Sequence, residues 1–311
     1  MNRFALVASL LLITISAWSL PIGTSARQVI PDSVQQIISV DYRALRDSPT
    51  AQALKSQVLP ENLKQFEGSL RGIGIDSEHD LDQLTFVSFR AAKDSLKTVG
   101  IAQGSFTQKA VLRKLQLKKI KPLRYNNVST YPMGGGGMRM AFLDESTLLF
   151  GDASSVRSAL DVRDGMSPNL ENNEQISDMI GGVESGPVWS VLDQKGTQNM
   201  MMSALGDAAR LADYNVLKKR LLSSRYTMNF SNGVKFDLDV ATSDSMTAST
   251  LSSLVKAGMM YKKMNASPIE KLAIDSCTVD NDSSNLKLHF KTDDNKFQSL
   301  MHSQLFAAVS K

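Results

Sequence analysis

Cysteine and histidine are scarce in this sequence. Cys277 is the only cysteine, so no intramolecular disulfide can form and the fold must be stabilised by core burial. We expect Cys277 to be a buried, inert thiol, because no helix N-terminus or histidine is evident beside it to activate a nucleophile. None of the three histidines (His79, His289, His302) stands at metal-ligand spacing from another ligand residue, so a zinc site has no local support.

Catalytic signatures are also missing. No Gly-x-Ser-x-Gly elbow occurs. The four glycines at 134–137 are followed by Met138-Arg139 rather than the Lys-Ser/Thr of a phosphate loop, so a connection between strands is expected there. The acidic stretch 76–82 around His79 lacks the ligand spacing of a calcium loop and is expected to be a solvated loop. We therefore predict no catalytic, cofactor or metal residues, and no enzyme.

The N-terminus has the layout of a secretory signal peptide. A short basic start, Met1-Asn2-Arg3, precedes an apolar run at 4–20, and Thr24-Ser25-Ala26 offers small residues for cleavage after Ala26. The alternative is an uncleaved membrane anchor, since about 17 apolar residues approach the length that spans a bilayer. Either way the sequence predicts an exported chain, in the periplasm or at the cell surface.

The order of predicted elements divides the rest of the chain in two. We expect a signal peptide at 1–26, a first half at 27–165, a linker at 166–186 and a second half at 187–311. Each half is predicted as strand, helix, two strands, helix, two or three strands and helix, whose first six elements follow the ferredoxin-like order. The fold class is therefore α+β, with two tandem ferredoxin-like (βαββαββα-type) halves.

Hydrophobic alternation and turn residues give the local detail. Charged residues alternate with apolar ones over 234–240, which predicts antiparallel sheets with helices packed on one face. Ser48-Pro49 and Asp152 are expected to begin helices, and Ser105 or Thr107 to begin another. Asn232-Gly233 predicts a tight hairpin turn. The stretches 269–279 and 286–292 are expected to be two strands of a further hairpin.

Four short segments carry a resemblance to known proteins. They are Asp41-Tyr42-Arg43-Ala44-Leu45-Arg46-Asp47-Ser48-Pro49, Gly74-Ile75-Asp76 through Leu84, Ala141-Phe142-Leu143-Asp144 and Gly186-Pro187-Val188-Trp189. Together they make most of the chain after residue 26 resemble uncharacterised secreted bacterial α+β proteins with an internal duplication. That group has no assigned activity and supplies no catalytic or ligand residues to carry over.

One stretch is strongly basic. No acidic residue occurs between its first and last basic residues, which are Lys109, Arg113, Lys114, Lys118, Lys119, Lys121 and Arg124. One interpretation is a solvated helix face followed by an edge strand that lysine protects from pairing. The other is a surface for an anionic partner, such as lipid headgroups or an acidic protein. Nucleic acid is not favoured, because aromatic residues are not interleaved with the charges.

Methionine is abundant on two predicted helices, at 200–202 and at 259, 260 and 264. Core packing or an adaptable apolar surface is expected there, with a thioether copper site as an alternative. From all of this we predict a non-enzymatic binding or interaction module of unknown partner. A periplasmic carrier of an apolar or lipid ligand, lined by these methionines, is the alternative, and an unrecognised hydrolase comes third.

Overall fold

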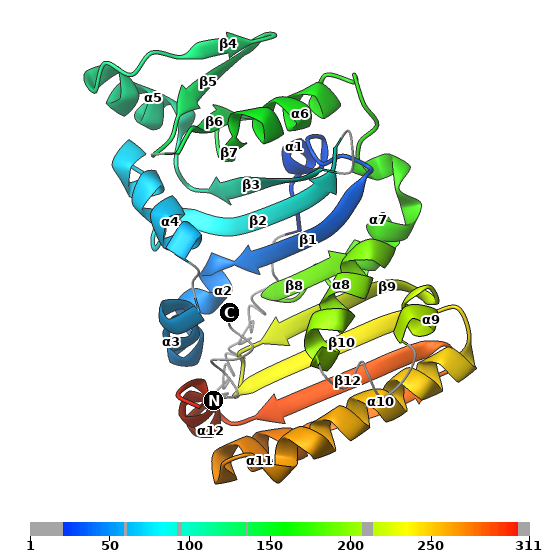
Figure 1. Ribbon diagram of the computed structural model, residues 1–311. Helices are drawn as coiled ribbons and strands as arrows, with labels where there is room; N and C mark the ends of the chain where they lie inside the picture. The colour runs from blue at the N-terminus through cyan, green and yellow to red at the C-terminus, as the bar shows by residue number, and fades with distance from the viewer. Residues whose placement is uncertain (1–20, 59–60, 92–94, 135, 207–213, 304–311) are drawn as a thin grey trace, which may run out of the picture.

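Twelve strands form one antiparallel sheet in the computed structural model, which describes residues 21–58, 61–91, 95–134, 136–206 and 214–303. The strands run in the spatial order β11-β12-β10-β9-β8-β1-β2-β3-β7-β6-β5-β4 (Figure 1). Their bounds are β1 Val34–Asp41, β2 Leu81–Arg90, β3 Leu96–Gly104, β4 Leu123–Tyr125, β5 Val128–Pro132, β6 Met138–Phe142, β7 Thr147–Asp152, β8 Val188–Leu192, β9 Leu221–Asn229, β10 Val234–Thr242, β11 Cys277–Asp282 and β12 Asn285–Thr292. The α+β class and the antiparallel pairing are as predicted.

The order of strands differs from the ferredoxin-like expectation. β1 lies directly beside β2 and antiparallel to it, although helices connect them, so β1 and β2 do not form a split βαβ unit. The first half runs β1-β2-β3-β7-β6 from the centre outward, and the second half runs β8-β9-β10-β12-β11. Antiparallel pairing of β1 with β8 joins the two halves in mid-sheet.

Helices lie on both sides of the sheet. Their bounds are α1 Thr24–Arg27, α2 Tyr42–Arg46, α3 Pro49–Val58, α4 Glu61–Ile73, α5 Gln108–Leu117, α6 Ala153–Arg163, α7 Glu174–Gly181, α8 Gln194–Leu205, α9 Tyr214–Lys218, α10 Ser245–Met264, α11 Pro268–Asp275 and α12 Asp294–Met301, with a 3-10 turn at Leu170–Asn172. We name the face that carries Phe86 and Leu238 face A, and the face that carries Val87 and Asp237 face B. Residues paired across neighbouring strands share a face, so the register extends both names over the whole sheet.

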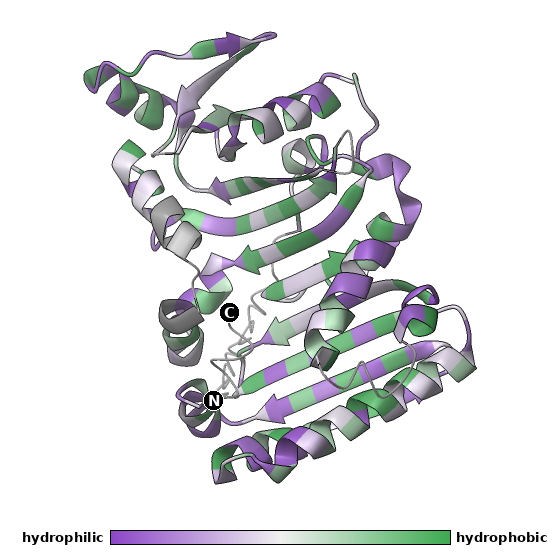
Figure 2. Cartoon of the chain, viewed as in Figure 1, coloured by the Kyte–Doolittle hydropathy of each residue, from purple (hydrophilic) through white to green (hydrophobic). Residues whose placement is uncertain are grey.

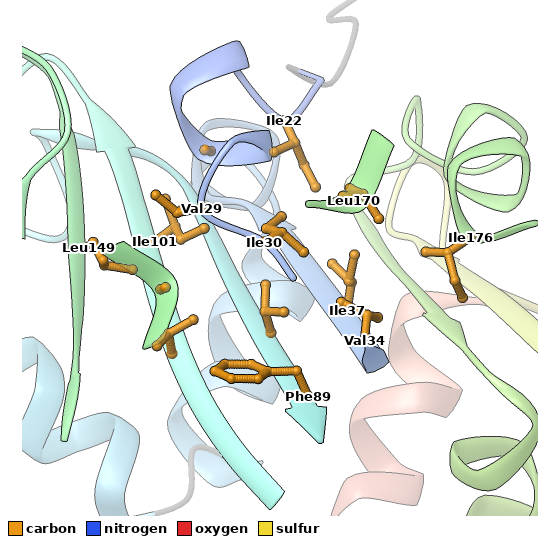
Figure 3. Close-up of a cluster of buried hydrophobic side chains, with 14 of the residues drawn as sticks. Ile22, Val29, Ile30, Val34, Ile37, Phe89, Ile101, Leu149, Leu170 and Ile176 are labelled. Atoms are coloured by element: carbon orange, nitrogen blue, oxygen red, sulfur yellow. The ribbon is translucent and has the colours of Figure 1, made fainter. Parts of the chain in front are cut away.

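The first half is covered on both faces, which corrects the expectation of helices on one face only. On face A, α4 and α5 pack on side chains such as Leu84 and Leu148. On face B, α1, α6 and α7 pack on side chains such as Ile37, and Figure 3 draws part of this cluster. Strands buried on both faces cannot keep one polar face, which is why β7 contains the continuous apolar run Leu148-Leu149-Phe150.

Beyond β8, the second half is covered on face A alone. Helices α8, α9 and α10 bury Val240 and Leu286 in one cluster, and α3 and α12 bury Val234 in another. Purple and green alternate along β10 and β12 in Figure 2, as expected for strands with one buried face. None of the four apolar clusters of the described residues includes a face-B side chain of β9, β10, β11 or β12.

The segment 166–186, expected to be a linker, is packed into the core. Leu170, Ile176, Ile180 and Val183 are buried in the face-B cluster, with α7 against β8. The boundary predicted after Ala26 also falls inside a packed element, because Ala26 is fully buried. The apolar run expected at 4–20 lies outside the described residues. Within the described part of the chain, no helix has the length and hydropathy that crossing a membrane requires.

The cap and turn predictions are confirmed, but one strand prediction is wrong. Asp152 accepts hydrogen bonds from the amides of Ser154 and Ser155 at 2.8 and 3.0 Å, and Ser48 and Thr107 cap α3 and α5 in the same way. The strand expected over 269–279 is a helix, α11, followed by the short strand β11. Ser267 and Glu270 form a capping box around Pro268, a start signal visible in the sequence.

Candidate functional site: the open face of the second half

A single row of paired residues on face B shows where the helical cover ends. In the first half and β8 the row contains Val99, Val87, Ile37 and Val191, all buried in the face-B cluster. Across β9, β10, β12 and β11 the same row continues as Arg225, Asp239, Lys287 and Asp280. The change from apolar to charged residues occurs between β8 and β9. We call the uncovered part, defined by Arg225, Thr227, Asp237, Asp239, Lys287 and His289, the open face.

Charges of both signs are paired on this open face. Arg225 Nη2 lies 3.1 Å from Asp239 Oδ2, and His289 Nδ1 lies 2.6 Å from Asp237 Oδ1. Lys287 Nζ lies 2.9 Å from Asp282 Oδ2, which raises the pKa of the lysine and lowers that of the carboxyl. The second oxygen of Asp239, Oδ1, is buried and has no hydrogen-bond partner among the described residues. A buried acceptor of this kind is costly unless a donor reaches it.

The end of α7 forms a wall beside the open face. A pocket of about 310 Å³ lies between Gly182-Val183 and the strands β9, β10 and β12. Gly182 has no side chain there because a Cβ would stand 2.4 Å from Arg225 Nη1. A Cβ at Gly186 would stand 3.5 Å from the Thr227 side chain, an ordinary contact. The segment expected to be a linker therefore shapes one side of the pocket.

The chemistry that this surface offers is recognition by charge and hydrogen bonding. Guanidinium, ammonium and imidazole groups stand beside carboxylates on a rigid sheet, so charges of both signs can be matched. A metal site is not assembled: no group of three or more His, Cys, Asp or Glu residues in the described part of the chain could hold an ion. The alternation in 234–240 predicted a polar strand face, but only the sheet order reveals that four strands present it together.

The basic residues predicted as an anionic-partner surface do lie together. All seven are exposed, on α5, on β4 and on the turn between them, at the end of the sheet opposite β11 (Figure 1). Two of them have structural contacts, because Lys118 Nζ donates to the Gly72 carbonyl at 2.5 Å and the Lys114 side chain lies against Gly74. Both contacts place positive charge at the C-terminus of α4, where the helix dipole favours it.

The other residues singled out in the sequence are not brought together. His79 is exposed and contacts Asp76 in its own loop, with Nδ1 and Oδ2 3.0 Å apart. Gly134, Gly136 and Gly137 connect β5 to β6 with positive φ angles. Cys277 donates to the Ala273 carbonyl, and burial raises its pKa to about 11, so its thiol is mostly protonated near neutral pH.

The methionines singled out in the sequence divide between the core and the surface. Met201 is buried in the cluster of α8, α9 and α10, with Met200 and Met259 packed against it. Met260 and Met264 are 71% and 72% exposed on α10. Methionine therefore contributes partly to the core and partly to the surface.

Several shifted pKa values belong to groups with structural roles. Hydrogen bonds from the first turn of α10 lower the pKa of Asp244 to about 2. Hydrogen bonds from the first turns of their own helices likewise hold the pKa values of Asp152 and Asp293 below the usual range. Burial raises the pKa of Tyr42, and Glu67 adds to the effect. These groups are distributed among helix ends and the core instead of meeting in one cleft.

Comparison with known proteins does not assign the chain to a family. No protein-family model and no curated protein matches the chain. Among solved structures, crystal form I of TP0453 aligns with a TM-score of 0.47 and 8% identity, covering 92% of this chain and 97% of that one. Crystal form III of TP0453 aligns with a TM-score of 0.46 and 7% identity, covering 88% and 96%. Since both TM-scores lie below 0.5, this similarity says nothing about what the chain does.

Proposed function

We propose that this protein is an exported, non-enzymatic interaction module and that its partner surface is the open face of the second half. The observation that supports this is the asymmetry of cover: helices bury both faces of the first half and leave four charged strands of the second half exposed. A sheet face exposed only to solvent needs neither the wall formed by α7 nor a buried carboxylate oxygen without a donor. Both features suit a surface that a partner completes.

The partner that fits best is a polypeptide with exposed charges of both signs. Arg225 and Lys287 stand on either side of Asp239 on neighbouring strands, so a surface of one sign would meet repulsion as well as attraction. A partner N–H donor that reached Asp239 Oδ1 would satisfy the buried acceptor. An apolar ligand would leave these groups desolvated and unpaired.

The carrier of an apolar ligand remains our second candidate, and native mass spectrometry separates the two. A carrier would retain an adduct of lipid mass that is lost on denaturation. The apolar cluster beneath α8 and α10 is filled by described side chains such as Met201, Leu251 and Leu286, which does not favour a lipid cavity at that place. For this reason we place the interaction module first and the unrecognised hydrolase third.

We also infer that the two halves are an internal duplication. Each half runs strand, helix, two strands, helix, hairpin and helix, and β4 and β5 are an addition to the first. The spatial order, 1-2-3-5-4 within each half, is the same if that addition is set aside. On this view the first half has kept helical cover on face B, and the second half has lost or never gained it.

Site-specific photo-cross-linking in the exporting cell tests the proposed surface. A photoreactive amino acid at position 237 or 289 should cross-link to one protein, whereas the same group at Lys256, on α10, should not. Both test positions are exposed, so the group can be accommodated. The cross-linked protein is then identified by mass spectrometry, purified, and titrated calorimetrically against this chain.

Charge reversal provides the quantitative test. Asp237→Lys combined with Lys287→Glu should weaken the Kd about ten-fold or more, equivalent to about 1.4 kcal/mol. The matched control is Asp47→Lys with Lys271→Glu, at two exposed positions away from the open face, and should leave the Kd unchanged. Equal weakening by both pairs, or cross-links from Lys256 alone, would refute the proposed surface.

A further inference from the structure

A second exposed surface lies at the opposite end of the sheet and differs from the open face in its chemistry. It comprises five of the basic residues, namely Lys109, Arg113, Lys119, Lys121 and Arg124, together with two exposed leucines, Leu117 and Leu123. We call it the α5–β4 surface. No ion pair joins any of its basic residues to an acidic residue in the described part of the chain. Its positive charge is therefore available to a partner.

The leucines are the feature that the charge pattern did not predict. Leu117, at the end of α5, is 77% exposed, and Leu123, on β4, is 59% exposed. Helix α5 buries Val111 and Leu115 on its inner side, so it does not need Leu117 for its own packing. Large apolar side chains surrounded by basic residues are typical of segments that lie at a membrane surface, with the apolar groups entering the boundary between headgroups and acyl chains.

Lys119, just after α5, occupies a backbone position at which glycine would be more stable. Lys119 has a φ of +56°, and the amides of Lys119 and Ile120 donate to the carbonyls of Gln116 and Leu115. This is the Schellman ending of a helix, in which the left-handed residue is usually glycine. A lysine in that conformation is strained, and strain of this kind is retained where it has a use.

We propose that the α5–β4 surface docks on an anionic lipid bilayer. Lysine and arginine supply the attraction to lipid phosphates, and Leu117 and Leu123 enter the interface. A nucleic acid would instead call for stacking aromatics among the charges, and the one tyrosine of β4, Tyr125, is held by a hydrogen bond to Asp161. This inference is independent of the partner proposed for the open face.

Vesicle sedimentation of the full chain, in the form recovered from the cells that make it, tests the proposal. The chain should bind vesicles of 30% phosphatidylglycerol and 70% phosphatidylcholine, and bind pure phosphatidylcholine far less. Each basic residue near an anionic surface strengthens partitioning about five-fold, so Lys109→Gln with Lys121→Gln and Arg124→Gln should reduce it about 100-fold. Raising the salt concentration should reduce binding in the same direction.

Two further variants separate docking from general electrostatics. Leu117→Ser with Leu123→Ser should weaken binding to the anionic vesicles and leave binding to a single-stranded oligonucleotide unchanged. Lys119→Gly should raise the thermal stability and weaken vesicle binding. If Lys119 had only a structural role, the stability would change and vesicle binding would not. The matched control, Lys195→Gln with Lys219→Gln and Lys256→Gln, removes three exposed charges elsewhere and should bind as the wild type does.

The proposal is overturned by any of three results. One is equal binding to anionic and neutral vesicles. Another is equal loss in the control and the α5–β4 variants, which would place the binding elsewhere in the chain. The third is oligonucleotide binding as strong as vesicle binding, with the leucine variant unaffected in both, which would indicate a nucleic-acid surface.

Discussion

The clearest quantitative prediction concerns where the folded part of the chain begins. Ile22 is only 3% exposed and lies in the face-B cluster beside Val29 and Ile30 (Figure 3). Its carbonyl accepts a hydrogen bond from Arg27 Nε at 3.1 Å. Cleavage after Ala26, which the small residues at 24–26 predict, would remove Ile22 from the core. A chain that begins at Pro21 should therefore be more stable than one that begins at Arg27.

The size of the effect follows from the buried groups. Replacing a buried isoleucine by alanine costs about 2–5 kcal/mol, because apolar burial is lost and a cavity remains. Removing residues 21–26 also deletes the fully buried methyl group of Ala26, worth about 0.8 kcal/mol. We expect a loss of about 3–6 kcal/mol for the chain that begins at Arg27, and of about 2–5 kcal/mol for Ile22→Ala in the longer chain.

Urea denaturation measures both losses. With an m-value of about 3 kcal/mol/M, a loss of 3 kcal/mol lowers the midpoint by about 1 M urea without changing m. Thr24→Ala is the matched control, because Thr24 is exposed and should change the stability by less than about 0.5 kcal/mol. Equal midpoints for the two chains would refute the reasoning, and would show that α1 contributes nothing to the core.

Three other predictions concern single groups. The folded pKa of about 2 for Asp244 lies below its unfolded value of about 3.9, so its contribution to stability is present above pH 4 and lost as the pH falls toward 2; Asp244→Asn should flatten that part of an acid titration followed by circular dichroism. Gly100→Ala should lower the unfolding free energy by about 1–3 kcal/mol, since its Cβ would stand 1.9 Å from the Phe150 ring. Gly68→Ala has no heavy atom within 4 Å of the new Cβ and should raise the unfolding free energy by about 0.5–1 kcal/mol. Thermal unfolding measures both changes. Cys277, with its pKa near 11, should react with iodoacetamide at pH 8 about 100-fold more slowly than free cysteine, and a rate equal to that of the unfolded chain would contradict its burial.

The helix caps and tight turns could be predicted from the sequence because they depend on neighbouring residues. The side chains of Ser48, Thr107 and Asp152 accept amide hydrogens two or three residues ahead, within their own first turn. Asn232 and Gly233 both take positive φ angles at the hairpin turn. The start signal of α11 was equally local, but the stretch 269–279 was interpreted as a strand.

The candidate surfaces were predictable in part. The basic stretch from Lys109 to Arg124 was recognisable from charge alone, whereas the exposure of Leu117 and Leu123 depends on what packs against α5 and β4. The open face was suggested by the polar positions between 234 and 240. The extent of the open face could not be predicted, because the alternation within one strand does not show which strands lie beside it.

The sequence by itself determined the α+β class, most of the helix starts, the hairpin turn at 232–233 and the positions of the charges, all of which depend on contacts a few residues apart. Tertiary structure alone decided that β1 pairs with β8, that the strands follow an order other than the ferredoxin-like one, and that helical cover on face B ends between β8 and β9. The physical reason is that these features depend on pairings between residues about 150 positions apart, such as Ile37 with Val191. Many sheet orders suit the same list of elements, and only the packing of all of them together selects one.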